Sequence, residues 1–127
     1  MAANTPTIIT ASGQTVRLNE ILQIIASAYA GAGTLRGRRW QVSATNSFPA
    51  SDANRKWDTR HRASDSRSQG AQWVEIPLES LELAANTTYY LSCADLNTSA
   101  ETSSWATAIS IVTEANLYTS TKWTQGQ

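Results

Sequence analysis

LAANTTYYLSCA, residues 83–94, joins a turn signal to a strongly alternating run. Tyr89, Leu91 and Cys93 carry side chains that suit a buried position, and the residues between them suit a surface. A period of two is the pattern of a strand with one buried face. The stretch therefore predicts a β-strand in the middle of a β-sandwich.

Tyr89 lies at the start of this strand, directly after the turn Asn86-Thr87-Thr88. A tyrosine in that position buries its ring and pairs its hydroxyl with a backbone group a few residues upstream, which is called a tyrosine corner. The alternative is a surface tyrosine on an ordinary strand. The two readings differ in whether the Tyr89 hydroxyl bonds the backbone before the turn.

Further alternating runs lie at 38–44, 72–77 and 105–113, with a shorter edge strand at 56–60. Their spacing is typical of a β-sandwich, whereas βαβ units place helices between their strands. The positions predicted to point into the core are Trp40, Val42, Val74, Ile76, Leu83, Tyr89, Leu91, Cys93, Trp105 and Ile109.

Residues 18–29 fit two structures. Their apolar residues follow helical spacing up to a glycine placed to end a helix. Read as a strand, Leu22 and Ile24 share one face, and Ile21 and Ile25 share the other. The neighbouring alternating runs favour the strand, although the pattern alone slightly favours the helix.

The chain of 127 residues is long enough for one domain with terminal arms. Residues 1–17 hold a single short β-prone run and are expected to form an N-terminal arm or an edge strand. Residues 18–113 carry the β-sandwich. Residues 114–127 form a polar C-terminal tail in which Tyr118 and Trp123 have no core of their own, so the tail either docks on a neighbour or frays.

The formal net charge is zero, which gives no overall attraction to nucleic acid or to an anionic membrane. We therefore expect neither as a partner. No apolar run approaches the length of a membrane span, and the first residues lack the basic region of a secretory signal. One segment is nevertheless basic, since eight of the ten cationic side chains fall in it, namely Arg36, Arg38, Arg39, Arg55, Lys56, Arg60, Arg62 and Arg67.

The residues that carry enzyme chemistry are scarce. His61 is the single histidine and lies between two arginines, and Cys93 is the single cysteine on an inward register. A metal site needs several such ligands together, and a catalytic triad needs a placed nucleophile. The glycines at 31 and 33 lack the residues that complete a phosphate-binding loop. We expect no catalytic residue, no metal and no cofactor.

Several features occur in a recognisable order, namely AGAGT at 30–34, Trp40-Gln41-Val42-Ser43, Val74-Glu75-Ile76-Pro77, residues 83–90, and Ser104-Trp105 before the last strand. Through them, residues 27–113 resemble a fibronectin type III-like domain of the kind found in phage and bacterial surface proteins. The resemblance implies an all-β, immunoglobulin-like antiparallel β-sandwich. The segment from Arg60 to Gly70 is longer than is usual in such domains.

A module of this type with terminal arms resembles small structural proteins of tailed phages. The resemblance implies a non-catalytic virion protein, made in the host cytoplasm, that either decorates the capsid or forms part of the tail or neck. Its partners would be other virion subunits or further copies of itself, bound through the arms and the sheet surface. The interface candidates are Ile8, Ile9, Arg36, Arg38, Arg55, Trp57, Arg60, Tyr118 and Trp123.

A second function remains open. The chain has five tryptophans, and exposed aromatic rings are also the platforms on which sugars stack. A carbohydrate-binding or host-adhesion module would lay Trp57 or Trp73 against a sugar ring. Glycan binding would persist in an isolated monomer, whereas assembly would depend on the arms.

Overall fold

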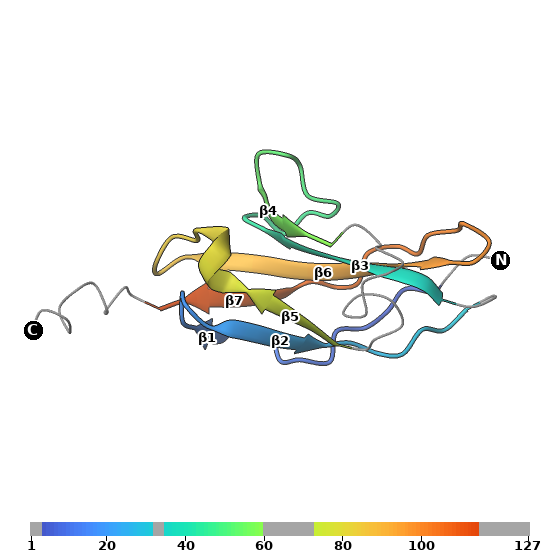
Figure 1. The fold of residues 1–127 in the computed structure, drawn as a ribbon, viewed down its shortest axis with the longest axis horizontal. Helices are drawn as coiled ribbons and strands as arrows, with labels where there is room; N and C mark the ends of the chain where they lie inside the picture. Colours follow the sequence, from blue (N-terminus) through green and yellow to red (C-terminus); the bar gives the residue numbers. More distant parts are fainter. Residues whose placement is uncertain (1–3, 32–34, 60–72, 115–127) are drawn as a thin grey trace, which may run out of the picture.

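Two β-sheets pack face to face in the computed structural model, which describes residues 4–31, 35–59 and 73–114. Figure 1 shows the strands and the short helix in chain order. Their bounds are β1 Gln14–Val16, β2 Ile21–Ile25, β3 Leu35–Ser43, β4 Arg55–Asp58, β5 Trp73–Pro77, the 3₁₀ helix η1 Leu78–Leu81, β6 Thr88–Asn97 and β7 Ile109–Thr113.

The larger sheet has the order β1-β7-β6-β3-β4, and the smaller sheet pairs β2 with β5. All of these pairs are antiparallel except β1 with β7, which is parallel. The chain thus crosses between the layers on both sides of β2 and again on both sides of β5. This is an immunoglobulin-like, fibronectin type III-like β-sandwich, the fold that the resemblance implies.

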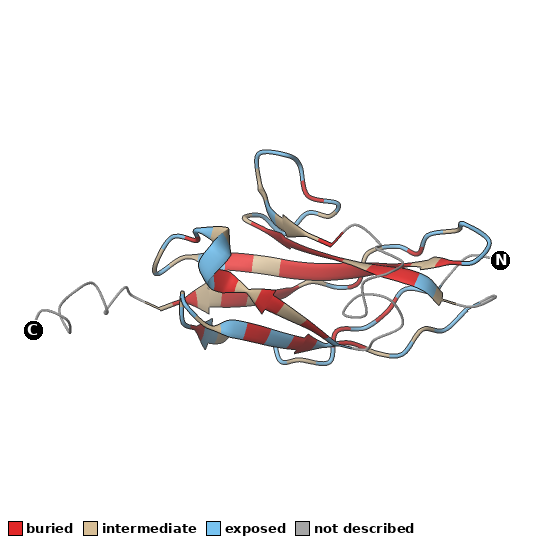
Figure 2. Cartoon of the chain, viewed as in Figure 1, coloured by how far each residue is buried: buried red, intermediate tan, exposed pale blue. Residues whose placement is uncertain are grey.

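The core lies between the two sheets, and Figure 2 shows buried residues alternating with exposed ones along β2 and mostly with half-buried ones along β5. Leu22 and Ile24 of β2 face inward with exposed fractions of 5% and 0%, so residues 21–25 form a strand and not a helix. Val74 and Ile76 of β5 meet them across the pair, because Ile24 stands opposite Val74 and Leu22 opposite Ile76. The other predicted core residues in the cluster are Trp40, Val42, Leu83, Tyr89, Leu91, Cys93 and Ile109.

The tyrosine corner is confirmed. The backbone N–H of Ala84 donates a hydrogen bond to the Tyr89 hydroxyl oxygen over 2.8 Å, and the Tyr89 ring is buried. The Ala84 carbonyl in turn accepts a hydrogen bond of 2.7 Å from the Thr113 hydroxyl at the end of β7. The corner therefore ties the turn before β6 to the last strand of the same sheet.

The N-terminal segment belongs to the sandwich. Ile8 forms a β-bridge with Ala26 beyond the end of β2 and lies in the core. The chain then crosses to the other layer, where β1 becomes an edge strand beside β7. Ile8, predicted to be available for docking, is only 9% exposed, because the bridge to Ala26 turns its side chain inward.

Trp105 corrects another prediction. We expected it in the core at the start of a strand over 105–113, but β7 begins only at Ile109. The alternation of residues 105–108 was therefore interpreted as part of the strand, although these residues lie before it. Trp105 is half-buried and packs on Phe48, with 5.7 Å between their ring centroids, outside the core cluster.

Candidate functional site

The outer surface of the small sheet carries large apolar side chains. Within residues 4–31, 35–59 and 73–114, the exposed large hydrophobic residues are Ile9 at 61%, Ile21 at 68%, Ile25 at 40% and Trp73 at 39%. Ile21 and Ile25 belong to β2, and Trp73 belongs to β5. The backbone N–H of Ile9 donates to the Ile25 carbonyl over 2.8 Å, which places Ile9 beside the same layer.

The strand register arranges these residues at the two ends of one surface. Ile25 stands opposite Trp73 at one end, and Ile21 stands opposite Pro77 at the other. Gln23 and Glu75 pair in the middle. We call this surface the β2–β5 face, and it consists of Ile9, Ile21, Gln23, Ile25, Trp73, Glu75 and Pro77.

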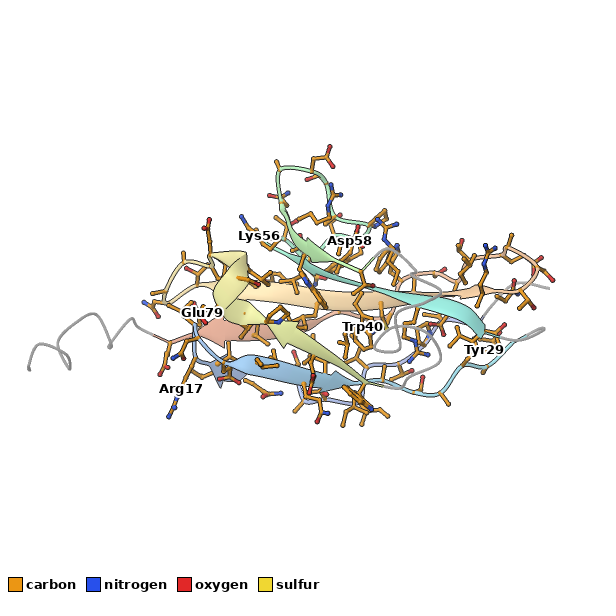
Figure 3. All side chains as sticks on the ribbon, in the orientation of Figure 1. Arg17, Tyr29, Trp40, Lys56, Asp58 and Glu79 are labelled. Atoms are coloured by element: carbon orange, nitrogen blue, oxygen red, sulfur yellow. The ribbon has the colours of Figure 1, made fainter. Side chains whose placement is uncertain are left out.

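The β2–β5 face is acidic at the end where Ile21 stands opposite Pro77. Glu20 precedes β2, and Glu79 and Glu82 follow β5 in and after η1. The sequence holds no lysine or arginine in 18–31 or in 73–94. At the edge of this region, Arg17 lies 3.8 Å from the carboxylate of Glu114 (Figure 3 labels Arg17 and Glu79).

The outer surface of the large sheet is built differently. The Gln41 side-chain oxygen accepts a hydrogen bond of 2.8 Å from the backbone N–H of Ala50, which holds the loop after β3 against the sheet. The Arg39 guanidinium lies 5.9 Å from the centre of the Trp105 ring and pairs with both carboxylate oxygens of Asp58, at 2.8 and 2.6 Å. These hydrogen bonds outweigh partial burial and raise the pKa of Arg39.

Arg38 is not at the surface, although it was an interface candidate. It is 1% exposed and forms hydrogen bonds of 2.6 and 2.9 Å with the two carboxylate oxygens of Asp95, which is fully buried. Burial disfavours the charged guanidinium, but the hydrogen bonds and negative charge of Asp95 overcome it and raise the pKa of Arg38. The pair is internal because Arg38 and Asp95 stand opposite each other in the pairing of β3 with β6.

Other interface candidates are scattered. Arg36 is exposed on β3, whereas Arg55 is half-buried, with hydrogen bonds to Asp52 and to the Ala50 carbonyl. Trp57 is half-buried against the core, opposite Val42. Ile9 alone among the candidates joins the β2–β5 face. Three further candidates, Arg60, Tyr118 and Trp123, lie outside the described residues.

The described residues offer little for metal or thiol chemistry. They contain no group of three or more His, Cys, Asp or Glu that could hold a metal ion. Burial raises the pKa of the Cys93 thiol to about 12, so the thiol is protonated and unreactive at neutral pH. No helix in the same part of the chain is long and apolar enough to cross a membrane.

Ile21 and Ile25 are surface residues that sequence reasoning did not select. The signal was present, because the strand reading of residues 18–29 already placed both on the face opposite Leu22. The pattern did not say that this second face stays uncovered. That information comes from the small sheet having no third layer packed on it among the described residues.

The sequence matches no protein-family model, and no curated protein matches it. Solved structures do match. The α-L-rhamnosidase of Streptomyces avermitilis, complexed with L-rhamnose, aligns with 89% of this chain at 16% identity and a TM-score of 0.53. The α-L-rhamnosidase of Dictyoglumus thermophilum aligns with 92% at 10% identity and a TM-score of 0.61.

The chain spans only 10% and 13% of the length of those two enzymes. Fibronectin(III)-like modules of Clostridium thermocellum CbhA also align, over 87% of this chain and 98% of theirs, at 15% identity and a TM-score of 0.47. At these identities the two rhamnosidase matches establish a shared β-sandwich fold.

Proposed function

We propose that this chain is a non-catalytic module that binds another protein through the β2–β5 face. The observation that carries the proposal is the gathering of the exposed Ile9, Ile21, Ile25 and Trp73 on one layer. Large exposed apolar side chains gathered on one face among polar residues are typical of protein–protein contacts. Burying one such side chain contributes roughly 1.5–3 kcal/mol.

The setting we propose is a larger assembly, with a tailed-phage virion as the specific case. Two points support it. The sequence resembles fibronectin type III-like domains of phage and bacterial surface proteins, and the same fold occurs as a small part of two much longer chains. In each setting a small β-sandwich is an accessory unit beside a larger body. The identity of the protein bound by the β2–β5 face would show whether the larger body is a capsid, a tail or a neck.

Site-specific photo-crosslinking in the producing cells tests the docking. A photo-crosslinking amino acid replaces Ile25 in one variant and Trp73 in another. The matched control places it at Thr107, which is exposed on the segment before β7 in the other layer. We expect adducts in the assembled fraction from positions 25 and 73 and few or none from position 107, because crosslinking requires direct contact.

Mass spectrometry of the adducts identifies the partner. A virion subunit or a second copy of this chain in the adduct supports the proposal, and a virion subunit supports the proposed setting as well. Equal yields from all three positions would overturn the docking surface. A cellular protein unrelated to any particle would leave docking in place and contradict the virion setting.

A carbohydrate-binding module is the second candidate, and the exposed Trp73 ring favours it. Glu75 lies two residues along the same face and offers a carboxylate to a sugar hydroxyl. Titration with L-rhamnose and with a glycan panel, followed through the tryptophan fluorescence, tests this function. Saturable quenching that disappears in Trp73→Ser, but persists in a control Ile21→Ser, would favour sugar binding over protein docking.

A further inference from the structure

The small sheet has one closed edge and one open edge. Beside β2 the N-terminal segment supplies a neighbour, because the Ile25 carbonyl accepts a hydrogen bond from the Ile9 N–H over 2.8 Å. The Ile25 N–H donates to the Thr10 hydroxyl over 2.7 Å. On its other side β2 pairs with β5, and within residues 4–31, 35–59 and 73–114 no strand pairs with the far side of β5. That side of β5 is the open edge.

The pairing with β2 identifies the backbone groups that face the open edge. The Leu78 N–H donates to the Glu20 carbonyl over 3.2 Å, so residues 20 and 78 continue the β2–β5 register as a hydrogen-bonded pair. Hydrogen-bonded and non-hydrogen-bonded pairs alternate along an antiparallel ladder. The even-numbered residues of β5 therefore bond to β2, and the N–H and C=O groups of Trp73 and Glu75 point away from it. Pro77, which has no N–H to donate, falls in the same phase.

The open edge thus presents main-chain donors and acceptors. Those of Trp73 and Glu75 have no partner among the described residues, whereas the Pro77 carbonyl accepts a hydrogen bond of 2.9 Å from the Ser80 hydroxyl. An unpaired strand edge is a template for one more strand. The partner that fits it is an extended peptide, held by main-chain hydrogen bonds and by its side chains at alternate positions.

Residues 115–127 of this chain, ANLYTSTKWTQGQ, have the composition of such a strand. Threonine, tyrosine and tryptophan favour strands, and alternate positions place Tyr118 and Lys122 on one side. An aromatic ring thus comes first on that side, and Lys122, the one charged side chain of the segment, comes last. The segment is therefore apolar at one end of this side and cationic at the other.

β5 has the matching order of side chains. It begins at the exposed Trp73 and ends at Pro77, where Glu79 follows in η1. A parallel pairing sets Tyr118 beside Trp73 and brings Lys122 beside Pro77, at the acidic end of the β2–β5 face. Aromatic pairs and opposite charges on neighbouring strands stabilise a sheet, whereas an antiparallel pairing would direct Lys122 towards the apolar end.

The same chain cannot supply the segment in this orientation. Glu114, the last described residue, lies 3.8 Å from Arg17 and donates its N–H to the Val16 carbonyl of β1, at the Ile21 end of the molecule and in the large sheet. Trp73 is at the other end of the small sheet, roughly 13 Å along the strand and about 10 Å across the layers. The four residues from 115 to 118 span at most roughly 14 Å. A second copy can supply the segment without this limit.

Building on the proposed function, we propose that the protein bound at the β2–β5 face is a second copy of this chain, whose residues 117–122 add to the open edge of β5 as a parallel strand. The N–H groups of Trp73 and Glu75 donate to the carbonyls of residues 117 and 119. Their carbonyls accept from the N–H groups of residues 119 and 121. Tyr118 then packs beside Trp73 on the outward side of the sheet.

Proline substitutions block this pairing from either side. Glu75→Pro removes an N–H that points away from β2, and β5 already holds a proline two positions later, so the urea midpoint should stay close to that of the wild type. Its control, Glu75→Gln, keeps the N–H. The double variant Thr119→Pro with Thr121→Pro removes two donors of the added segment. Its control, Ser120→Pro, removes an N–H that points away from β5 in the proposed pairing.

Multi-angle light scattering over a concentration series gives the result. We expect the wild type and both controls to associate, and Glu75→Pro or the double variant alone to stay near the monomer mass of 13.8 kDa. An equal mixture of these two should form a one-to-one dimer, because the intact segment of one meets the intact edge of the other. The double variant lies outside the strands of the sandwich, so it decides the test even if Glu75→Pro does not fold.

A wild type that is monomeric at every concentration, a double variant that associates as the wild type does, or a mixture that stays monomeric would each overturn the strand addition. A Ser120→Pro control that is as weak as the double variant would overturn it too. The proposed function has a separate outcome. If the wild type is monomeric while position 73 crosslinks to a different protein, the β2–β5 face still docks and only its partner changes.

Discussion

The two sheets of this sandwich differ in the polarity of their outer surfaces and in what covers those surfaces. The large sheet places polar groups outward, and the loops after β3 and before β7 cover them through contacts such as Ala50 with Gln41 and Phe48 with Trp105. The small sheet places isoleucines outward and leaves them bare. The loops therefore cover the polar outer surface of the large sheet, whereas the apolar outer surface of the small sheet stays open. This is expected if a second protein covers the small sheet.

The largest expected effect concerns the covered layer. Asp95→Ala leaves the Arg38 guanidinium buried without its partner, which should lower the free energy of unfolding by about 3–5 kcal/mol. Urea denaturation measures it. The matched double variant Arg38→Met with Asp95→Leu should recover most of the loss, because it removes both charges. Equal losses in the single and double variants would show that packing, and not the unpaired charge, is responsible.

Substitutions at two neighbouring isoleucines of β2 allow a direct comparison of the inner and outer sides of the small sheet. Ile24→Ala removes a fully buried side chain and should cost about 2–5 kcal/mol of unfolding free energy. Ile25→Ala truncates an exposed one and should change stability by less than about 0.5 kcal/mol. Urea unfolding of the pair is the measurement, and a similar loss for both would mean that the β2–β5 face is already covered within the single chain.

A smaller effect is expected at the tyrosine corner. Tyr89→Phe keeps the buried ring and removes the hydroxyl that accepts from the Ala84 N–H. Because Ala84 is exposed, only the net contribution of a typical hydrogen bond, about 0.5–1.5 kcal/mol, should be lost. The value should appear in thermal or urea unfolding of Tyr89→Phe, with Tyr90→Phe as the control on the outward side of β6. An unchanged free energy of unfolding would show that the hydrogen bond of the tyrosine corner does not stabilise the large sheet.

The smallest effect is on Cys93. Its raised pKa, about 12 against an ordinary 9.0, means that the folded chain holds the thiol proton more tightly than the unfolded chain. The resulting stability is present below pH 9 and decreases as the pH rises from about 9 towards about 12. At pH 8 a thiol reagent should label the protein only after denaturant is added, whereas rapid labelling of the native protein would place the thiol at the surface.

Alternation along the chain predicted the architecture because a buried strand must place every second side chain inward. The strands around Trp40, Val74 and Tyr89 were found in this way, and so was the inward-facing Ile109 of β7. The choice of a strand for residues 18–29 depended on its neighbours, since its own pattern suits a helix as well.

What escaped prediction depends on pairing between distant residues. β1 has only Gln14–Val16 to identify it, and its partner β7 lies far along the chain, since Gln14 pairs with Ile111. Arg38 looked like a surface cation until the register of β3 with β6 set it opposite Asp95. No local pattern reports such a pair. For the same reason the sequence revealed the two faces of β2 but not which partner each one meets.

Radical footprinting of tryptophan oxidation tests the central claim, that the β2–β5 face is covered by protein in the assembled state. The free chain and the assembled fraction are exposed to hydroxyl radicals and digested, and oxidation is measured at Trp73 and at Trp105, which serves as the internal control from the other layer. We predict that assembly protects Trp73 and leaves Trp105 unchanged. Equal oxidation of Trp73 in both samples would contradict the claim.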